Sequence, residues 1–160
     1  MYGEASHADR MRALVQRVSE ASVDLAGERI ASIAAGLLVF CGIAPADRPD
    51  DAQWLARKIV RLRIFDDDAG AMNRSLVDIV GSVLAVSQFT LYASTRKGAR
   101  PSYGAAAAPE SAQPLFDTFV ASLERELGRA VVRGRFGAHM QVALVNDGPV
   151  TLWLDSNVRE

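Results

Sequence analysis

An unbroken apolar run, Gly36 to Ile43 (Gly-Leu-Leu-Val-Phe-Cys-Gly-Ile), constrains the fold of this chain more than any other stretch. Such a run is typical of a strand that is covered on both faces, because a strand with one face in water alternates apolar and polar residues. Pro45, Asp47 and Pro49 follow the run and break the chain. We therefore expect a strand here that lies inside a layered domain.

Other stretches have the composition or the alternation of strands. Residues 12–18 are rich in strand-forming types. Residues 21–25 alternate apolar and polar side chains before Ala26-Gly27 turns the chain back into residues 28–33, which predicts a hairpin. Further strands are expected over residues 82–89, 130–133, 140–145 and 150–154.

Two helices are expected. The first begins near Arg48, because Pro49 suits a first turn and apolar residues then recur at spacings of three and four. The second spans Pro109 to Leu127, with Ser111 as a candidate N-cap and Gly128 at its end. Pro114 fits this helix only if it lies within the first turn.

The predicted order of elements is β-β-β-α-β-α-β-β-β, with the hairpin among the first strands. This order predicts an α/β (α+β-like) fold, a single layered domain in which two helices pack against curved, barrel-like sheets. A length of 160 residues without an internal repeat or linker favours one domain. We assign the domain to residues 11–156, a disordered extension to residues 1–10 and a tail to residues 157–160.

Composition excludes several classes of protein. The formal net charge of −1 does not demand nucleic acid, although a local basic patch can still serve RNA. The single cysteine, Cys41, excludes an intrachain disulfide framework and fits a reducing cytoplasm. No apolar run reaches the roughly 18 residues of a membrane span, so no membrane partner is expected.

The usual catalytic groups are missing from the sequence. Its two histidines are His7, in the predicted extension, and His139, which we interpret as a surface or core residue. One cysteine and two histidines do not build an ordinary zinc site. The carboxylates Asp66, Asp67 and Asp68 are consecutive, and consecutive residues rarely converge on one ion, so we predict a turn there; metal-dependent hydrolysis through them is an alternative. No metal or cofactor is expected.

Two stretches carry the candidate site. The strand that begins at Ser82 ends in Ser87-Gln88-Phe89-Thr90, which places hydroxyl and amide groups where rigid scaffold meets open chain. Far downstream lies Asn146-Asp147-Gly148-Pro149-Val150-Thr151.

Two groups of basic residues can be interpreted either as solvated surface or as contact sites for a ligand. The loop from Thr95 to Ser102 contains Arg96, Lys97 and Arg100; it is either solvated or in contact with phosphate. The first helix carries four cations away from its apolar stripe, and this face is either solvated or in contact with tRNA. These cations are Arg57, Lys58, Arg61 and Arg63.

Both candidate stretches resemble motifs of one family, the D-aminoacyl-tRNA deacylases. Ser87-Gln88-Phe89-Thr90-Leu91 is similar to the family's Ser-Gln-x-x-Leu motif, and Asn146 to Thr151 is similar to its Gly-Pro motif. The resemblance runs from Met11 to about Ser156. Shorter stretches match in the same order: 63–65, 72–73, 100–102 and 134–136.

The resemblance implies a cytoplasmic homodimer that hydrolyses the ester between a D-amino acid and the 3′ end of tRNA. It also implies removal of glycine mischarged onto tRNA(Ala). The Gly148-Pro149 bond is expected to be cis and to reach into the pocket of the partner subunit. A non-catalytic homodimeric module that binds a small ligand or RNA is the alternative.

The same resemblance implies roles for individual residues. Ser87, Gln88, Phe89 and Thr90 are the candidate catalytic residues, with backbone N–H groups near Phe89 and Thr90 stabilising an oxyanion. The attacking group is the Thr90 hydroxyl, a water or the tRNA 2′-hydroxyl; we favour the last two, because no base is expected beside Thr90. The candidate substrate-binding residues are Gly148, Pro149, Phe136 and Met140. Asn146 and Thr151 are expected to brace the Gly-Pro turn.

Overall fold

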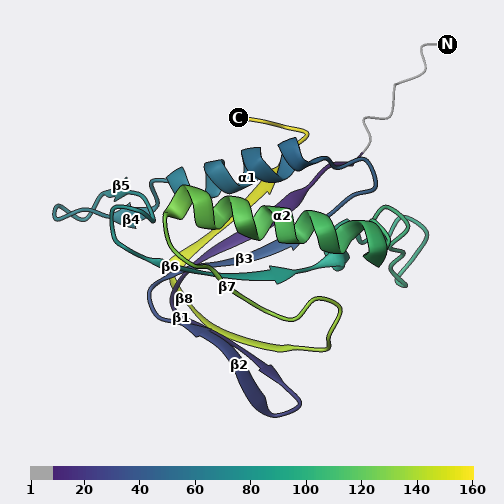
Figure 1. The fold of residues 1–160 in the computed structure, drawn as a ribbon, viewed down its shortest axis with the longest axis horizontal. Coiled ribbons are helices and arrows are strands. Elements are labelled where there is room, and N and C mark those ends of the chain that lie inside the picture. The colour runs from purple at the N-terminus through teal and green to yellow at the C-terminus, as the bar shows by residue number, and fades with distance from the viewer. Residues whose placement is uncertain (1–8) are drawn as a thin grey trace.

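The computed structural model describes residues 9–160, and Figure 1 shows their arrangement. Two helices lie together over a strongly curved sheet, which confirms the α/β fold class. The elements are, in order, β1 (Arg12–Leu25), β2 (Glu28–Ile33), β3 (Gly36–Gly42), α1 (Pro49–Arg61), β4 (Phe65–Asp66), β5 (Met72–Arg74), β6 (Ser82–Ser87), the 3-10 helix η1 (Phe89–Tyr92), α2 (Pro109–Leu127), β7 (Val132–Arg133) and β8 (Gln141–Asp155). No helix among the described residues is long and apolar enough to cross a membrane.

The long strand β1 organises the main sheet. Along one edge its first half pairs antiparallel with β3 and its second half with β2, while β8 runs antiparallel along almost all of its other edge. β3 pairs in parallel with β6, and β6 with β7. The result is the order β2-β1-β3-β6-β7, with β8 added on β1, and it leaves the outer edge of β8 unpaired within the described chain.

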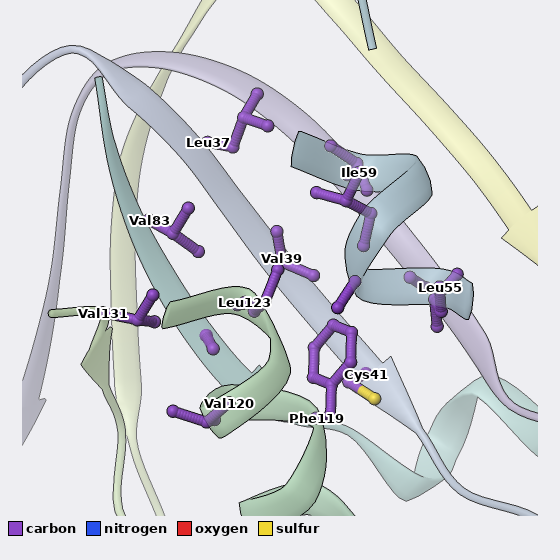
Figure 2. Packing of buried hydrophobic residues seen from close by; sticks show 14 of the residues in the cluster. Leu37, Val39, Cys41, Leu55, Ile59, Val83, Phe119, Val120, Leu123 and Val131 are labelled. Carbon is purple, nitrogen blue, oxygen red and sulfur yellow. The ribbon is translucent and has the colours of Figure 1, made fainter. Parts of the chain in front are cut away.

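β3 is covered on both faces, as the apolar run predicts. Leu37, Val39 and Cys41 point to the face on which α1 and α2 lie, where they meet Ile59 and Phe119 (Figure 2). Leu38 belongs to a second buried cluster on the opposite face, between β1, β2 and β6. The alternation of a strand therefore divides one apolar stretch between two cores.

The strand boundaries differ from the predictions where pairing continues across an irregularity. Residues 12–18 and 21–25 form the single strand β1, because β8 pairs with it on both sides of register shifts near Arg17 and Ser19. Residues 140–145 and 150–154 likewise belong to one strand, β8. The strand predicted over residues 82–89 ends at Ser87, and η1 begins at Phe89.

The predicted turn at Asp66–Asp68 is the tip of a short hairpin formed by β4 and β5. The Asp67 carboxylate accepts hydrogen bonds from the backbone N–H groups of Ala69 and Ala71, at 2.9 and 3.0 Å, and from the Asn73 side chain at 2.9 Å. These bonds lower the pKa of Asp67. The carboxylate therefore shapes the protein's own turn.

The helix boundaries agree with the sequence, but two details of α2 do not. Its N-cap is Ala108, so the prediction that Ser111 caps the helix is wrong. Pro114 lies inside the helix, past the first turn. The residue whose carbonyl loses a hydrogen bond to this proline is Glu110, which is exposed, so water can satisfy it.

Most of the predicted disordered extension, including His7, lies outside the described residues. Its last two residues, Asp9 and Arg10, do contact the fold. The Tyr92 hydroxyl donates a hydrogen bond to the Arg10 carbonyl at 2.5 Å, and the Asp9 carboxylate lies 3.3 Å from the Arg12 guanidinium.

Candidate functional site

A cleft of about 570 Å³ opens where β6 ends and α2 begins. Five of the residues singled out in the sequence line it: Ser87, Gln88, Phe89, Phe136 and Met140. The remaining walls come from the start of α2, from the segment before it and from residues 137–142; they include Tyr103, Ala107, Pro109, Ala112 and His139. Residues far apart in the sequence thus meet at one end of the sheet.

The polar end of β6 is held in place by close contact with the end of β3. The Gln88 N–H donates to the Cys41 carbonyl at 2.8 Å. A Cβ atom on Gly42 would lie 2.8 Å from the Tyr92 ring and 3.2 Å from the Gln88 carbonyl oxygen, so only glycine allows η1 to lie this close to β3. The first N–H groups of η1, those of Phe89 and Thr90, have no partner inside the helix, as at any helix start.

Thr90 is not among the residues that line the cleft, but its side chain contacts Gln88, which is. The Gln88 side-chain amide donates a hydrogen bond to the Thr90 hydroxyl. Among the described residues, no imidazole or carboxylate hydrogen-bonds to this hydroxyl. The geometry therefore provides Thr90 with a positioned partner but with no general base.

The cleft has an aromatic rim and an apolar floor. The Phe89 side chain is 56% exposed and meets the Tyr103 ring edge-on, with ring centroids 5.1 Å apart. The Phe136 ring packs beside the Phe116 ring of α2, with ring centroids 6.2 Å apart, and Met140 packs against the second buried cluster. Phe136 and Met140 thus combine core packing with lining the cleft.

The Gly148-Pro149 bond is cis and lies in a bulge of β8. Gln16 of β1 pairs with Thr151 and Val18 pairs with Asn146, so four residues of β8 oppose Arg17 alone. Gly148 has a φ of +137°, and a Cβ atom there would lie 2.9 Å from Val150 and 3.0 Å from the Arg17 guanidinium. Both the conformation and the space require glycine.

Asn146 and Thr151 brace this bulge, as expected. The Asn146 side chain accepts a hydrogen bond from the Val150 N–H at 2.9 Å and donates one to the Thr151 hydroxyl at 2.8 Å. Arg17 of β1 also supports the bulge, because its guanidinium donates hydrogen bonds to the carbonyls of Asp147 at 2.9 Å and Ile64 at 2.7 Å. Arg17 is only 9% exposed, so both bonds are shielded from water.

The bulge and the cleft of one chain lie apart. The bulge opposes Arg17, whereas the polar end of β6 at Ser87 pairs with Cys41, and the next residue, Gly42, pairs with Arg12 at the start of β1. At about 3.3 Å per residue, the separation between Arg17 and Arg12 along β1 is roughly 16 Å. Gly148 and Pro149 are exposed and do not line the cleft of their own chain.

Cys41 and Tyr92 lie near the polar end of β6, and both are buried. Burial raises the pKa of the Cys41 thiol and of the Tyr92 hydroxyl, so both stay protonated. The described residues contain no group of three or more histidine, cysteine or acidic side chains that could hold a metal ion. Asp66 and Asp68 lie 3.6 and 3.0 Å from Arg17 and Arg74, so their nearest charged neighbours are arginines.

Residues 14–155 match the family described as D-Tyr-tRNA(Tyr) deacylase. The chain belongs to this family. It is 60% identical over 146 residues to the D-aminoacyl-tRNA deacylase of Chromobacterium violaceum, a match that covers 91% of this chain and 97% of that protein. It is 58% identical over 150 residues to the D-aminoacyl-tRNA deacylase of Opitutus terrae, covering 94% and 100%.

Solved structures share the fold of this chain. The c-Myc DNA unwinding element binding protein superposes with a TM-score of 0.84 at 38% identity, covering 90% of this chain and 97% of that one. A probable eukaryotic D-amino acid tRNA deacylase has a TM-score of 0.79 at 15% identity, covering 91% and 98%, which supports the fold alone.

Two residues of this deacylase family member were not anticipated from its sequence. Arg17 had one available signal, a charged side chain inside a strand-forming stretch. Tyr103 had none beyond being an aromatic residue directly after a basic loop. His139, which the sequence analysis interprets as a surface or core residue, also lines the cleft and is exposed.

Proposed function

We propose that this chain hydrolyses the ester that joins a D-amino acid, or glycine mischarged onto tRNA(Ala), to the 3′ end of tRNA. The family and the names of its relatives support this activity. The observation that supports the site assignment is the polar end of β6, where Ser87, Gln88 and Phe89 form one wall of a cleft that Phe136 and Met140 also line. Hydrolysis would remove the wrong amino acid before translation uses it, and the cytoplasm, where translation takes place, is the compartment that we propose.

The active site is completed by a second copy of the chain. Gly148 and Pro149 are exposed and lie far from their own cleft, so they reach a cleft only on another protomer. β8, which carries them, has an unpaired outer edge and exposes Val145 and Trp153 by 48% and 49%. Unpaired strand edges and exposed apolar side chains favour association.

Selection of the D form follows from rigid main chain. A Gly-Pro turn that is held by Arg17, Asn146 and Thr151 presents backbone carbonyls at fixed positions. Carbonyls that accept bonds from the substrate's ammonium group leave no room in the direction of an L side chain, so the L form is excluded sterically. Glycine has no side chain and passes this filter.

The chemistry requires no histidine relay. The ester carbonyl lies against the N–H groups of Phe89 and Thr90, which stabilise the developing oxyanion. If a water attacks the carbonyl carbon, the ester C–O bond breaks, the amino acid is released as the free acid and the 3′ oxygen takes a proton. If the tRNA 2′-hydroxyl attacks first, the acyl group moves to the 2′ oxygen, and a water then cleaves that ester to release the amino acid. Gln88 keeps the Thr90 side chain in place through its hydrogen bond and so fixes the shape of η1.

Incubation of the purified protein with D-tyrosyl-tRNA and with L-tyrosyl-tRNA tests the proposal. Faster release of tyrosine from the D form is expected, and equal rates or no release would overturn it. The same assay in the presence of a chelator tests metal-dependent hydrolysis; unchanged rates are expected. Sedimentation of the same sample decides whether the active species is a dimer.

A further inference from the structure

A loop of three cations stands beside the mouth of the cleft. Residues 94–102, here called the basic loop, begin and end in a two-residue bridge: the N–H of Ser94 donates to the Ser102 carbonyl and the N–H of Ser102 to the Ser94 carbonyl, both at 2.8 Å. Arg96, Lys97 and Arg100 project from it and are exposed. The bridge fixes the two legs of the loop together, so the cations stand on a formed base.

These cations are not neutralised by the protein. Within residues 9–160 no carboxylate lies within ion-pairing distance of Arg96, Lys97 or Arg100, and their charged groups donate no hydrogen bond to the protein. The sequence contains no acidic residue between Asp78 and Glu110, a segment that includes Ser87–Thr90. The three cations of the loop therefore have no acidic neighbour in this stretch of the sequence, and the adjoining wall of the cleft adds no negative charge.

Cations on the helices are in a different situation. Arg57 of α1 lies 3.4 Å from Glu126, and Lys58 donates to an oxygen of Glu160 at 2.6 Å. Arg63, just after α1, donates to the backbone and side-chain oxygens of Asn73, both at 2.9 Å. Most of the basic face of the first helix thus has protein partners, and the basic loop does not.

The loop is near enough to the cleft to act on the same substrate. Tyr103, the next residue along the chain, lines the cleft and contacts Phe89. At no more than about 3.6 Å per residue, the Cα atom of Arg100 lies within roughly 11 Å of that of Tyr103. Figure 1 shows the segment of residues 93–104, drawn in teal-green, at the end of the molecule where α2 begins.

We propose that the basic loop binds backbone phosphates of the unpaired 3′ nucleotides of the RNA while the terminal ester occupies the cleft. The inference rests on the proposed function, which places the ester in that cleft. A polynucleotide with its 3′ end beside Ser87 must leave past the rim of the cleft, where Tyr103 and the loop stand. Arginine and lysine contact phosphates without regard to base, so the loop provides affinity for the common end of all tRNAs.

The magnitude follows from counterion release. For a single strand the slope of log K against log salt falls by about 0.7 per phosphate contact, so loss of three contacts flattens the slope by about 2. At roughly 0.1 M salt the same relation gives an affinity loss of about 100-fold. Such an effect is easily separated from the loss of a single surface charge.

The test compares two triple variants. In the loop variant Arg96→Ala, Lys97→Ala and Arg100→Ala are combined; in the control Lys58→Ala, Arg61→Ala and Arg125→Ala remove the same charge from the helices. Binding of a labelled single-stranded oligoribonucleotide with the tRNA 3′ sequence is followed by fluorescence anisotropy over a salt series. The loop variant should lose about 100-fold in affinity and flatten the slope by about 2, and the control should match the wild type.

Hydrolysis provides a second readout. D-tyrosyl-tRNA is compared with 3′-O-(D-tyrosyl)adenosine, which has no phosphate. In the loop variant KM for the tRNA should rise about 100-fold relative to KM for the adenosine ester, and Arg96→Lys with Arg100→Lys should preserve most of the wild-type value because charge is retained.

Three results would overturn the inference: an unchanged salt slope in the loop variant, an equal loss on the adenosine ester, or a larger loss in the helix control. Absence of D-selective hydrolysis by the wild-type protein would instead reject the proposed function. In that case oligonucleotide binding still decides whether the loop contacts phosphates.

Discussion

Removal of the Arg17 guanidinium tests whether buried hydrogen bonds hold the Gly148–Pro149 bulge. In Arg17→Met the aliphatic stem is approximately retained, but the carbonyls of Asp147 and Ile64 lose donors at 2.9 and 2.7 Å. A hydrogen bond from a charged group contributes about 1.5–3 kcal/mol, so the two together predict a loss of about 3–5 kcal/mol in the free energy of unfolding. The corresponding fall in Tm is at least about 6 °C.

The matched control is Arg29→Met on the neighbouring strand. Arg29 also faces an aspartate, Asp24 at 3.1 Å, but its side chain is 61% exposed. An exposed ion pair contributes about 0–1 kcal/mol, so this variant should unfold almost as the wild type does. Arg17→Lys should be intermediate, because an ammonium group does not reproduce the planar fork that spans two carbonyls.

Urea denaturation at one fixed protein concentration measures all three variants, because the proposed dimer would make apparent stability depend on concentration. The midpoint should shift for Arg17→Met without a change in the slope m. Equal midpoints for Arg17→Met and Arg29→Met would refute the view that Arg17 supports the bulge. A loss of stability with unchanged discrimination between D- and L-tyrosyl-tRNA would separate the support from the selection of the D form.

Three further outcomes are expected. Thr90→Val should retain substantial hydrolysis of D-tyrosyl-tRNA, since no base contacts this hydroxyl; complete loss with normal tRNA binding would restore Thr90 as the nucleophile. Burial raises the pKa of Asp47 to about 6, so between about pH 4 and 6 the folded protein binds a proton that the unfolded chain does not, and stability falls as pH rises through that window. Asp47→Asn should remove this part of the pH dependence of the urea midpoint. Parallel curves of urea midpoint against pH for the variant and the wild type would contradict the assignment. Val145→Glu, on the exposed face of β8, should weaken the proposed dimer and abolish hydrolysis while circular dichroism stays unchanged; a fully active monomer would exclude a site shared between copies.

Much of the fold could be predicted from local pattern. The apolar run at Gly36–Ile43 and the spacing of apolar residues in the helices depend only on which faces must be buried, and the structure follows them. Strand boundaries depend on the partner strand, which local sequence does not contain. β8 continues through Gly148 and Pro149 because its pairing with β1 resumes at Thr151, and no propensity of these residues indicates that.

The residues of the candidate site could likewise be predicted from local sequence only in part. Ser87, Gln88 and Phe89 are adjacent in sequence, and the end of a strand was enough to mark them. Phe136 and Met140 reach the same cleft through the chain path after β7, and only the family resemblance connected them to it. Arg17 was missed because its role arises from two distant carbonyls that the folded chain brings to it.

The hairpin of β4 and β5 gives a structural meaning to the short stretches that accompany the two main motifs. Arg63 binds Asn73 across this hairpin, and Asn73 binds Asp67 at its tip. The hairpin thereby fixes Ile64 and Asp66, whose carbonyl and carboxylate face Arg17 at 2.7 and 3.6 Å. Arg17 in turn holds Asp147 at the start of the bulge. The aspartates that first suggest a cation site therefore belong to a scaffold that reaches the Gly-Pro turn through one buried arginine. This scaffold holds the surface bulge rigidly, as the proposed role of the bulge in a neighbouring protomer requires.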